Sequence, residues 1–312
     1  MTTVTPEMIK SLRETSGAGM SDCRKSLVEN DGNIEAAVDW LRKKGLSSAA
    51  KKSGRVAAEG VVAVAVEGTK GTIIELNSET DFVARNEKFQ QLASGIAEFA
   101  VRHSIEDVEQ LKAAKCPKTG TSIQEQITNA IATIGENMNL RRCAILGVTS
   151  GVVASYVHSA VAPGMGKIAI LVAVETTGDV SKAEAFGKQI AMHIAAARPE
   201  SLTTDDLDSA KVERERAVFR EQATASGKPA DVIEKMVEGR VRKYYEEVVL
   251  FEQLFVVDGK TKISQVIADA AKTVGAPVKI LGFVSYRLGE GIEKAVTDFA
   301  AEVAAAAGTN AA

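Results

Sequence analysis

The run from Thr80 to Val83 places a carboxylate beside an aromatic ring, between a predicted strand at 72–77 and a predicted helix. Thr80 and Asp81 are both favourable residues for the N-cap of a helix. One interpretation is that Asp81 caps the helix while Phe82 packs in the core or against the first turn. The other is that the corner presents Asp81 and Phe82 to a partner molecule.

The usual motifs of catalysis and phosphate binding are missing from the sequence. No G-x-x-x-x-G-K-[ST] occurs, since Gly166 and Lys167 lack both the earlier glycine and the hydroxyl that follows. G-x-G-x-x-G and G-x-S-x-G are also missing. His103, His158 and His193 are scattered, and no His/Cys/Asp cluster has metal-ligand spacing. We therefore predict no metal, no cofactor and no catalytic residues.

The composition is that of an ordinary soluble globular protein. The 312 residues are 25% charged and 45% hydrophobic, and they are enough for two or more compact units. A net charge of -3 and an aromatic content of 4% argue against binding to nucleic acid. We therefore expect no direct nucleic-acid partner and a core built from aliphatic side chains.

The cysteines and the apolar runs indicate a cytoplasmic protein. Cys23, Cys116 and Cys143 are far apart and odd in number, which predicts free, buried thiols in a reducing compartment. Residues 1–6 lack the pattern of a signal peptide. The longest apolar runs are much shorter than a membrane span, so no membrane association is expected.

Residues 1–45 have the pattern of three short helices. Thr5 and Pro6 suit the start of the first helix, and apolar residues recur at helical spacing in the third. Met20 stands on a predicted turn, either packed into the small core or exposed at a contact surface. Residues 46–60 are small, polar and basic, which predicts a linker that could begin as a helix.

Two stretches share a strand-strand-helix pattern, which predicts an internal repeat. The strands are expected at 61–66, 72–77, 151–158 and 167–175. The corner of the second copy, at 176–180, has no aromatic residue where the first has Phe82. Because a requirement of the fold should appear in both copies, this difference indicates that Phe82 does more than pack.

The remaining chain is mostly helical. Further helices are expected at 122–138, 206–225, 230–245 and 263–274, with strands at 140–146 and 278–287 and a last helix from Ile292. The helices at 206–225 and 230–245 predict a projecting helical hairpin, which is either a solvated surface feature or a site of pairing with a second copy. The last helix has one apolar stripe, which must dock on the body or on a partner.

Several motifs resemble, in order, those of the elongation factor Ts family. The run from Glu75 to Arg85, which contains Thr-Asp-Phe-Val, is very similar to the signature of this family. Further similar segments lie at 12–27, 134–137, 190–196, 235–240 and 289–294. The resemblance therefore extends over the whole chain.

The resemblance implies an α+β fold with several parts. These are a three-helix ubiquitin-associated-like module at 1–45, a linker at 46–60, a core N-subdomain at 61–150, a core C-subdomain at 151–204 and 246–288, a helical hairpin at 205–245 and a C-terminal helical module at 289–312.

The resemblance also implies guanine-nucleotide exchange on elongation factor Tu, in its GDP-bound and nucleotide-free forms, during translation elongation. The family's Asp-Phe pair, here Asp81 and Phe82 between Thr80 and Val83, enters near the partner's nucleotide site and disturbs its Mg²⁺. Other positions that match the family's contacts are Arg13, Met20, Ile134, Gly135, His158, Met236 and Val237. The sequence departs from the family's pattern at Ser16, at Ser21 and in a longer loop at 159–166 beside His158.

An exchange factor needs no catalytic acid or base, because it acts by binding the nucleotide-free partner more tightly than the loaded one. Burial of one Phe contributes roughly 1.5–3 kcal/mol, so a long interface must supply the remainder. Two other classes stay open. A ubiquitin-associated-like helper or chaperone would bind through the first 45 residues alone, and a small-molecule enzyme would show turnover without a partner.

Overall fold

The computed structural model describes residues 4–225 and 227–293. Helices and strands are both abundant, which confirms the expected α+β class at this coarse level. The final helix expected from the sequence falls on residues 294–312 and lies outside the described residues. Within the described part of the chain, no helix has both the length and the hydropathy needed to cross a membrane.

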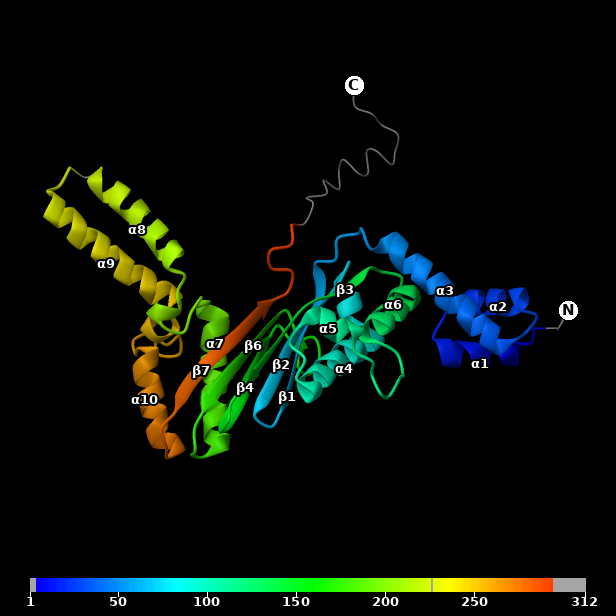
Figure 1. The fold of residues 1–312 in the computed structure, drawn as a ribbon. Helices are drawn as coiled ribbons and strands as arrows, with labels where there is room; N and C mark the ends of the chain where they lie inside the picture. Colours follow the sequence, from blue (N-terminus) through cyan, green and yellow to red (C-terminus); the bar gives the residue numbers. More distant parts are fainter. Residues whose placement is uncertain (1–3, 226, 294–312) are drawn as a thin grey trace, which may run out of the picture.

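The first part of the chain forms three helices followed by a sheet covered by helices (Figure 1). Its elements are α1 (Pro6–Ser16), α2 (Met20–Glu29), α3 (Ile34–Lys52), β1 (Glu59–Glu67), β2 (Lys70–Ser78), α4 (Glu87–His103), α5 (Val108–Ala113), α6 (Ile123–Ile134) and β3 (Met138–Gly147). The helix expected at 122–138 therefore ends earlier, at the left-handed Gly135, whose φ is 95°.

The second part forms another sheet and the hairpin. Its elements are β4 (Gly151–His158), β5 (Met165–Gly166), β6 (Ile168–Glu175), α7 (Val180–Ala197), α8 (Ser209–Thr224), α9 (Ala230–Val248), α10 (Ile263–Val274) and β7 (Lys279–Arg287). The helix expected from residue 206 begins instead at Ser209, because a 3-10 turn at Thr204–Asp206 precedes it and Asp208 caps it.

Helix α3 is longer than the sequence pattern predicted. It continues to Lys52, so the first half of the stretch expected as a linker is helical. Gly45 allows α3 to approach α6 closely, because a Cβ built there would lie only 3.2 Å from the Cβ of Ala132. Ala49 packs against the core of the first sheet. The end of α3 is therefore held by α6.

The two sheets lie face to face. The first has the strand order β3-β2-β1-β5 and the second β4-β6-β7. Helices α4 and α6 pack on the first sheet and α7 on the second. Between the sheets lies an aliphatic cluster whose buried members are Val62, Ile73, Val153, Ala169 and Leu171. Strand β2 is therefore buried on both faces, and from Gly71 to Ser78 its apolar and polar residues alike are buried.

The loop at 159–166 belongs to both sheets. It starts at the end of β4, but its strand β5 pairs with Val62 and Ala63 of β1. The carbonyl oxygen of Gly164 also accepts a hydrogen bond from the Val64 amide, at 2.9 Å. This loop thus adds a short strand to the edge of the first sheet.

A buried carboxylate joins the C-terminal segment to the first sheet. Glu75 of β2 is fully buried and lies 3.2 Å from Arg141 Nη1 and 2.5 Å from Arg142 Nε. A bulge in the β2-β3 ladder allows two consecutive arginines to reach one acid. The Gly289 amide donates to the same carboxylate at 2.8 Å. The chain around Gly289 is therefore fixed beside β2.

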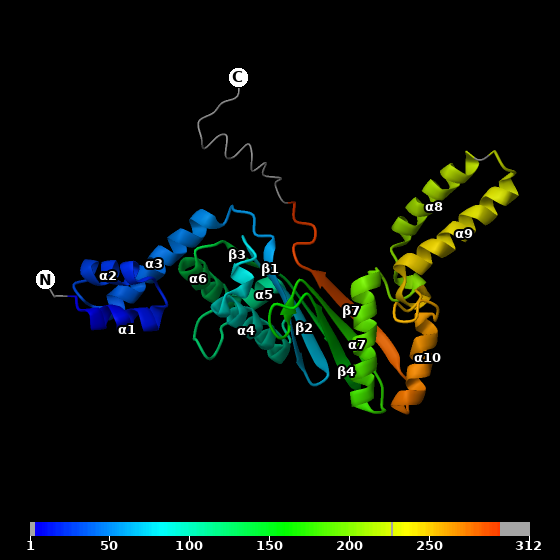
Figure 2. The same ribbon diagram turned by 180° about the vertical axis from the view of Figure 1, so that it is seen from behind.

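The hairpin of α8 and α9 extends away from the sheets (Figures 1 and 2). Its base is held by His193 of α7, which is fully buried. The Nε2–H of His193 donates to Gln253 Oε1 at 2.9 Å, and its Nδ1 accepts from the Val256 amide at 3.3 Å. Gln253 Nε2 in turn donates to the carbonyl of Glu247 at 2.6 Å. Both ring nitrogens are satisfied only when the imidazole is neutral.

We expect the protein to lose stability in mild acid because of His193. Burial lowers the pKa of His193 below its ordinary value of 6.5. The unfolded chain then takes up this proton first, so the stabilisation is complete above about pH 6.5 and declines as the pH falls toward the folded-state pKa. Thermal melts of the protein and of His193→Gln between pH 7.5 and 5 measure this. The decline should be smaller in His193→Gln, whereas the exposed His158→Gln should retain it. Equal declines in all three proteins would contradict the prediction.

Candidate partner-binding corner

The corner at 79–86 has a different local structure from the one expected. It contains a 3-10 turn at Val83–Arg85, and α4 is capped by Asn86, whose Oδ1 accepts from the Lys88 amide at 3.0 Å. The prediction that Thr80 or Asp81 caps this helix is therefore wrong. In the second sheet Asp179 does cap α7, accepting from the Lys182 amide at 3.1 Å.

The side chain of Phe82 points into solvent. It is 77% exposed, which makes it the most exposed large apolar side chain of the described residues. Asp81 beside it is exposed as well. Val83 and Ala84 are buried in the core of the first sheet. Phe82 is therefore not a core residue, whereas Val83 attaches the corner to the core of the first sheet.

The turn after α6 holds the other side of the corner. Glu136 accepts from the Thr80 amide at 2.9 Å and from Thr80 Oγ1 at 2.6 Å. In return, Glu79 accepts from the Asn137 amide at 2.5 Å. These contacts bring the predicted site residues Ile134 and Gly135, which directly precede Glu136, next to the corner.

Arg13 and Met20 lie on the neighbouring surface. Together with Gly17 and Lys88 they line a shallow hollow between the N-terminal helices and the start of α4. Met20 is the first residue of α2 and is 55% exposed. The interpretation that Met20 packs into the small core is therefore wrong, and its side chain is free to contact a partner.

The remaining predicted site residues lie elsewhere. His158 is exposed at the end of β4, and its Nδ1 is 3.0 Å from the hydroxyl of Tyr156. Met236 and Val237 are on α9, and the hairpin stands at the opposite end of the molecule from α1 to α3 (Figures 1 and 2). Val237 is fully buried between α8 and α9, so its side chain is not available to a partner. Met236 is half-buried beside it.

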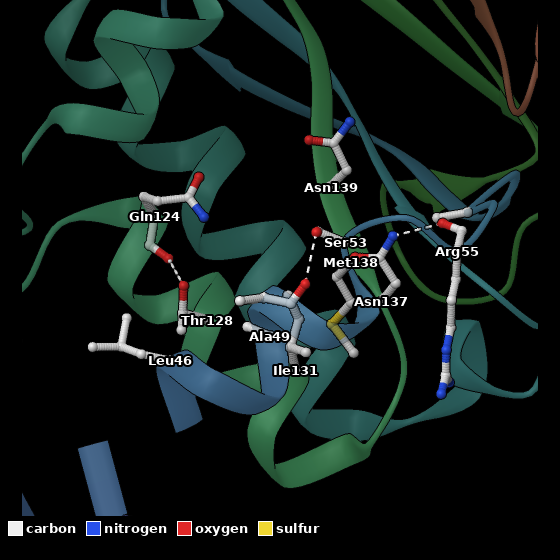
Figure 3. Close-up of a pocket in the computed structure, with 12 residues that line it drawn as sticks. Leu46, Ala49, Ser53, Arg55, Gln124, Thr128, Ile131, Asn137, Met138 and Asn139 are labelled. Carbon is white, nitrogen blue, oxygen red and sulfur yellow. Dashed lines mark hydrogen bonds between the residues drawn. The ribbon is translucent and has the colours of Figure 1, made fainter. Parts of the chain in front are cut away.

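A second hollow lies behind the corner, between the end of α3, α6 and the start of β3 (Figure 3). Its lining is mixed, with Leu46, Ala49 and Ile131 beside side-chain amides and two hydroxyls. Asn137 and Arg55 also line this hollow, and Asn137 Nδ2 donates to the carbonyl of Arg55 at 2.7 Å. Within the described residues no group of three or more His, Cys, Asp or Glu could hold a metal ion.

The sequence pattern did not assign roles to Glu79, Asn86, Glu136 and Asn137, which shape this corner. Glu136 and Asn137 belong to a segment that resembles the family's, but nothing in their spacing connects them with Thr80. The signal that could have found Asn86 is local, because Asn is a strong N-cap and it directly precedes the helical run at Glu87.

These features define a mixed helix-and-sheet protein that presents an exposed ring and an acid on a corner fixed at both ends. Residues 79–290 match the family model for elongation factor TS. The chain is 59% identical to elongation factor Ts of Rhodospirillum centenum, covering 99% of this chain and 100% of that protein. It is also 59% identical to that of Paramagnetospirillum magneticum, over 99% of both chains, and 54% identical to that of Sphingopyxis alaskensis, over 99% of this chain and 100% of the relative. The chain therefore belongs to the elongation factor Ts family, whose members are elongation factors of protein biosynthesis.

Proposed function

We propose that the protein is a guanine-nucleotide exchange factor for elongation factor Tu, which promotes GDP release in the cytoplasm and so supports translation elongation. One observation carries this proposal. In a member of the elongation factor Ts family, Phe82 is exposed beside Asp81, on a corner whose next residue, Val83, is buried in the core. The factor binds the GDP-bound and the nucleotide-free partner, and it binds the latter more tightly. By reciprocity, the affinity of the partner for GDP falls by the same factor.

In this proposal Asp81 and Phe82 enter the partner near its bound nucleotide and disturb the Mg²⁺ and phosphate contacts there. A carboxylate is suited to this role because it competes for the cation, and the ring is suited because it occupies space. Thr80 and Val83 fix the backbone on either side. The action is by binding, so the protein is not an enzyme in the catalytic sense.

The other proposed contacts extend the interface along the molecule. Ile134 and Gly135 precede the turn that contacts the corner, and Arg13 and Met20 line the hollow beside the start of α4. His158 and Met236 supply contacts further along the chain. Val237 supports Met236 from inside the hairpin. An interface of this length is required, because one buried ring contributes only about 1.5–3 kcal/mol.

We propose the finer division of the chain on the same basis. Residues 1–45 are a ubiquitin-associated-like module, and the units β1-β2-α4 and β4-β6-α7 are two copies of a strand-strand-helix repeat. The linker, the two core subdomains and the C-terminal module have the bounds expected from the sequence. The hairpin at 205–245 is a candidate for pairing with a second copy. Its exposed Val218 supports this, at 40% exposure.

Release of fluorescent GDP from purified elongation factor Tu tests the proposal. Stopped-flow traces with excess unlabelled GDP should accelerate as the concentration of the full chain rises. If the chain is a helper that binds through its first module, binding would be retained but release would stay at its spontaneous rate. That result, or a lack of binding in a pull-down, would contradict exchange activity.

A further inference from the structure

Two glutamates hold the corner and the turn after α6 in a reciprocal arrangement. Glu136, in the turn, accepts from the backbone amide and the hydroxyl of Thr80 at 2.9 and 2.6 Å. Glu79, in the corner, accepts from the Asn137 amide at 2.5 Å. Each acid therefore satisfies a backbone donor of the opposite segment, although the partners are 56 and 58 residues apart in the chain.

These contacts begin where the strand ladder ends. The last residues of the β2-β3 ladder are Ser78 and its partner Met138. Beyond them the two segments diverge, and the carboxylates replace the ladder hydrogen bonds that would otherwise hold the backbone. Hydrogen bonds to an ionised acceptor are short and strong, so they fix the position of Thr80 more firmly than a neutral acceptor would.

Only Asp81 and Phe82 lie between the fixed residues. Thr80 is held by Glu136, and Val83 is buried in the core. Because Phe82 is 77% exposed, packing of its own ring cannot set its direction. The direction must come from the backbone on both sides. A corner that is already ordered loses less conformational entropy on binding than a loose one.

The support of the turn continues into the segment after α3. Asn137 donates to the carbonyl of Arg55 (Figure 3). Arg55 Nη1 lies 3.4 Å from Glu79 Oε1. Glu79 thus has one partner on the turn and another on the chain that leads into β1. The corner is braced from two separate segments.

We infer that Glu136 is a positioning residue for nucleotide exchange, which holds Thr80 so that Asp81 and Phe82 meet the partner in one direction. This inference rests on the proposed exchange function. Glu136 does not itself touch the nucleotide site of the partner. It acts through the corner, so its effect depends on the presence of the two side chains that the corner presents.

Glu136→Ala should slow GDP release from elongation factor Tu at saturating concentrations of the full chain by about tenfold, because the variant loses two charge-assisted hydrogen bonds. Glu136→Gln keeps one acceptor oxygen. The rate of GDP release with this variant should lie between the rates with the native chain and with Glu136→Ala. The same substitution in an Asp81→Ala, Phe82→Ala background should change release by less than about twofold, since the residues that it positions are gone.

Asp206→Ala is the matched control. Asp206 holds the amide and the hydroxyl of Thr203 at 2.9 and 2.8 Å, in a turn of the second part of the chain. Its loss removes the same kind of contacts but should leave release unchanged. Amide hydrogen exchange should accelerate at Thr80 in Glu136→Ala and at Thr203 in Asp206→Ala.

A purely structural role would give a different pattern. Equal effects of Glu136→Ala in both backgrounds, or an unchanged release rate in the otherwise native chain, would overturn the inference while the exchange function stands. If the Asp81→Ala, Phe82→Ala variant accelerates GDP release from elongation factor Tu as much as the native chain does, the proposed role of the corner is wrong. The positioning role of Glu136 is then wrong as well.

Discussion

Replacing Phe82 with alanine is expected to slow GDP release from elongation factor Tu by about 10- to 100-fold at saturating factor, because burial of the ring in the partner contributes roughly 1.5–3 kcal/mol. The ring is 77% exposed in the free protein, so its loss leaves no cavity there. The free energy of unfolding should therefore stay within about 0.5 kcal/mol of the native value. Stopped-flow release of labelled GDP, together with urea unfolding, measures both.

Val257→Ala is a suitable control for this variant. Val257 is another exposed apolar side chain, 68% exposed, in the loop between α9 and α10. Its truncation should change neither release nor stability. Asp81→Ala should slow release as Phe82→Ala does, through the loss of charge at the same corner. If Phe82→Ala is folded and GDP release from elongation factor Tu is as fast as with the native chain, the ring of Phe82 has no role in exchange.

The second large effect concerns stability. Glu75→Ala should lower the free energy of unfolding by about 3 kcal/mol, because it leaves two arginines without their shared partner in a largely buried site. The side chains of Arg141 and Arg142 are only 28% and 26% exposed. The substitution also removes the acceptor of the Gly289 amide. Urea unfolding followed by circular dichroism measures the loss.

A surface ion pair between β1 and α4 supplies the comparison. Glu67 lies 3.5 Å from Arg102, and the side chains of both are more than half exposed. Glu67→Ala should cost less than about 1 kcal/mol, since solvent screens such pairs. If Glu75→Ala costs no more than Glu67→Ala, the buried cluster does not stabilise the junction between β2 and the C-terminal segment.

Local pattern was enough to predict much of the fold. Short apolar runs rich in β-branched residues located β1, β2, β4 and β6, and apolar residues at helical spacing located α4, α7 and α9. Both expected pairs of strands, β1 with β2 and β4 with β6, are antiparallel neighbours in the structure. These features depend on residues close together in the sequence, so periodicity alone reports them.

The parts that were mispredicted depend on contacts between distant segments. The end of α3 looked like a linker because its apolar partner, Ala132 of α6, is far away in the chain. Thr80 and Asp81 were favourable candidates for the cap of α4, but Thr80 is bound by Glu136 and Asn86 caps the helix. Val237 was expected at a partner surface and is buried by α8 instead. The pattern of residues within one segment does not show which distant segment it contacts.

The short strand β5 also has a consequence for solubility. Without it, β1 would be the edge of the first sheet, with a run of valines and free backbone donors and acceptors available to another chain. Met165 and Gly166 pair with Val62 and Ala63 near the middle of β1, so this edge of the sheet is interrupted there. The backbone of β1 that remains for a second molecule is divided into two short pieces. The loop at 159–166 thus works against edge-to-edge pairing along β1.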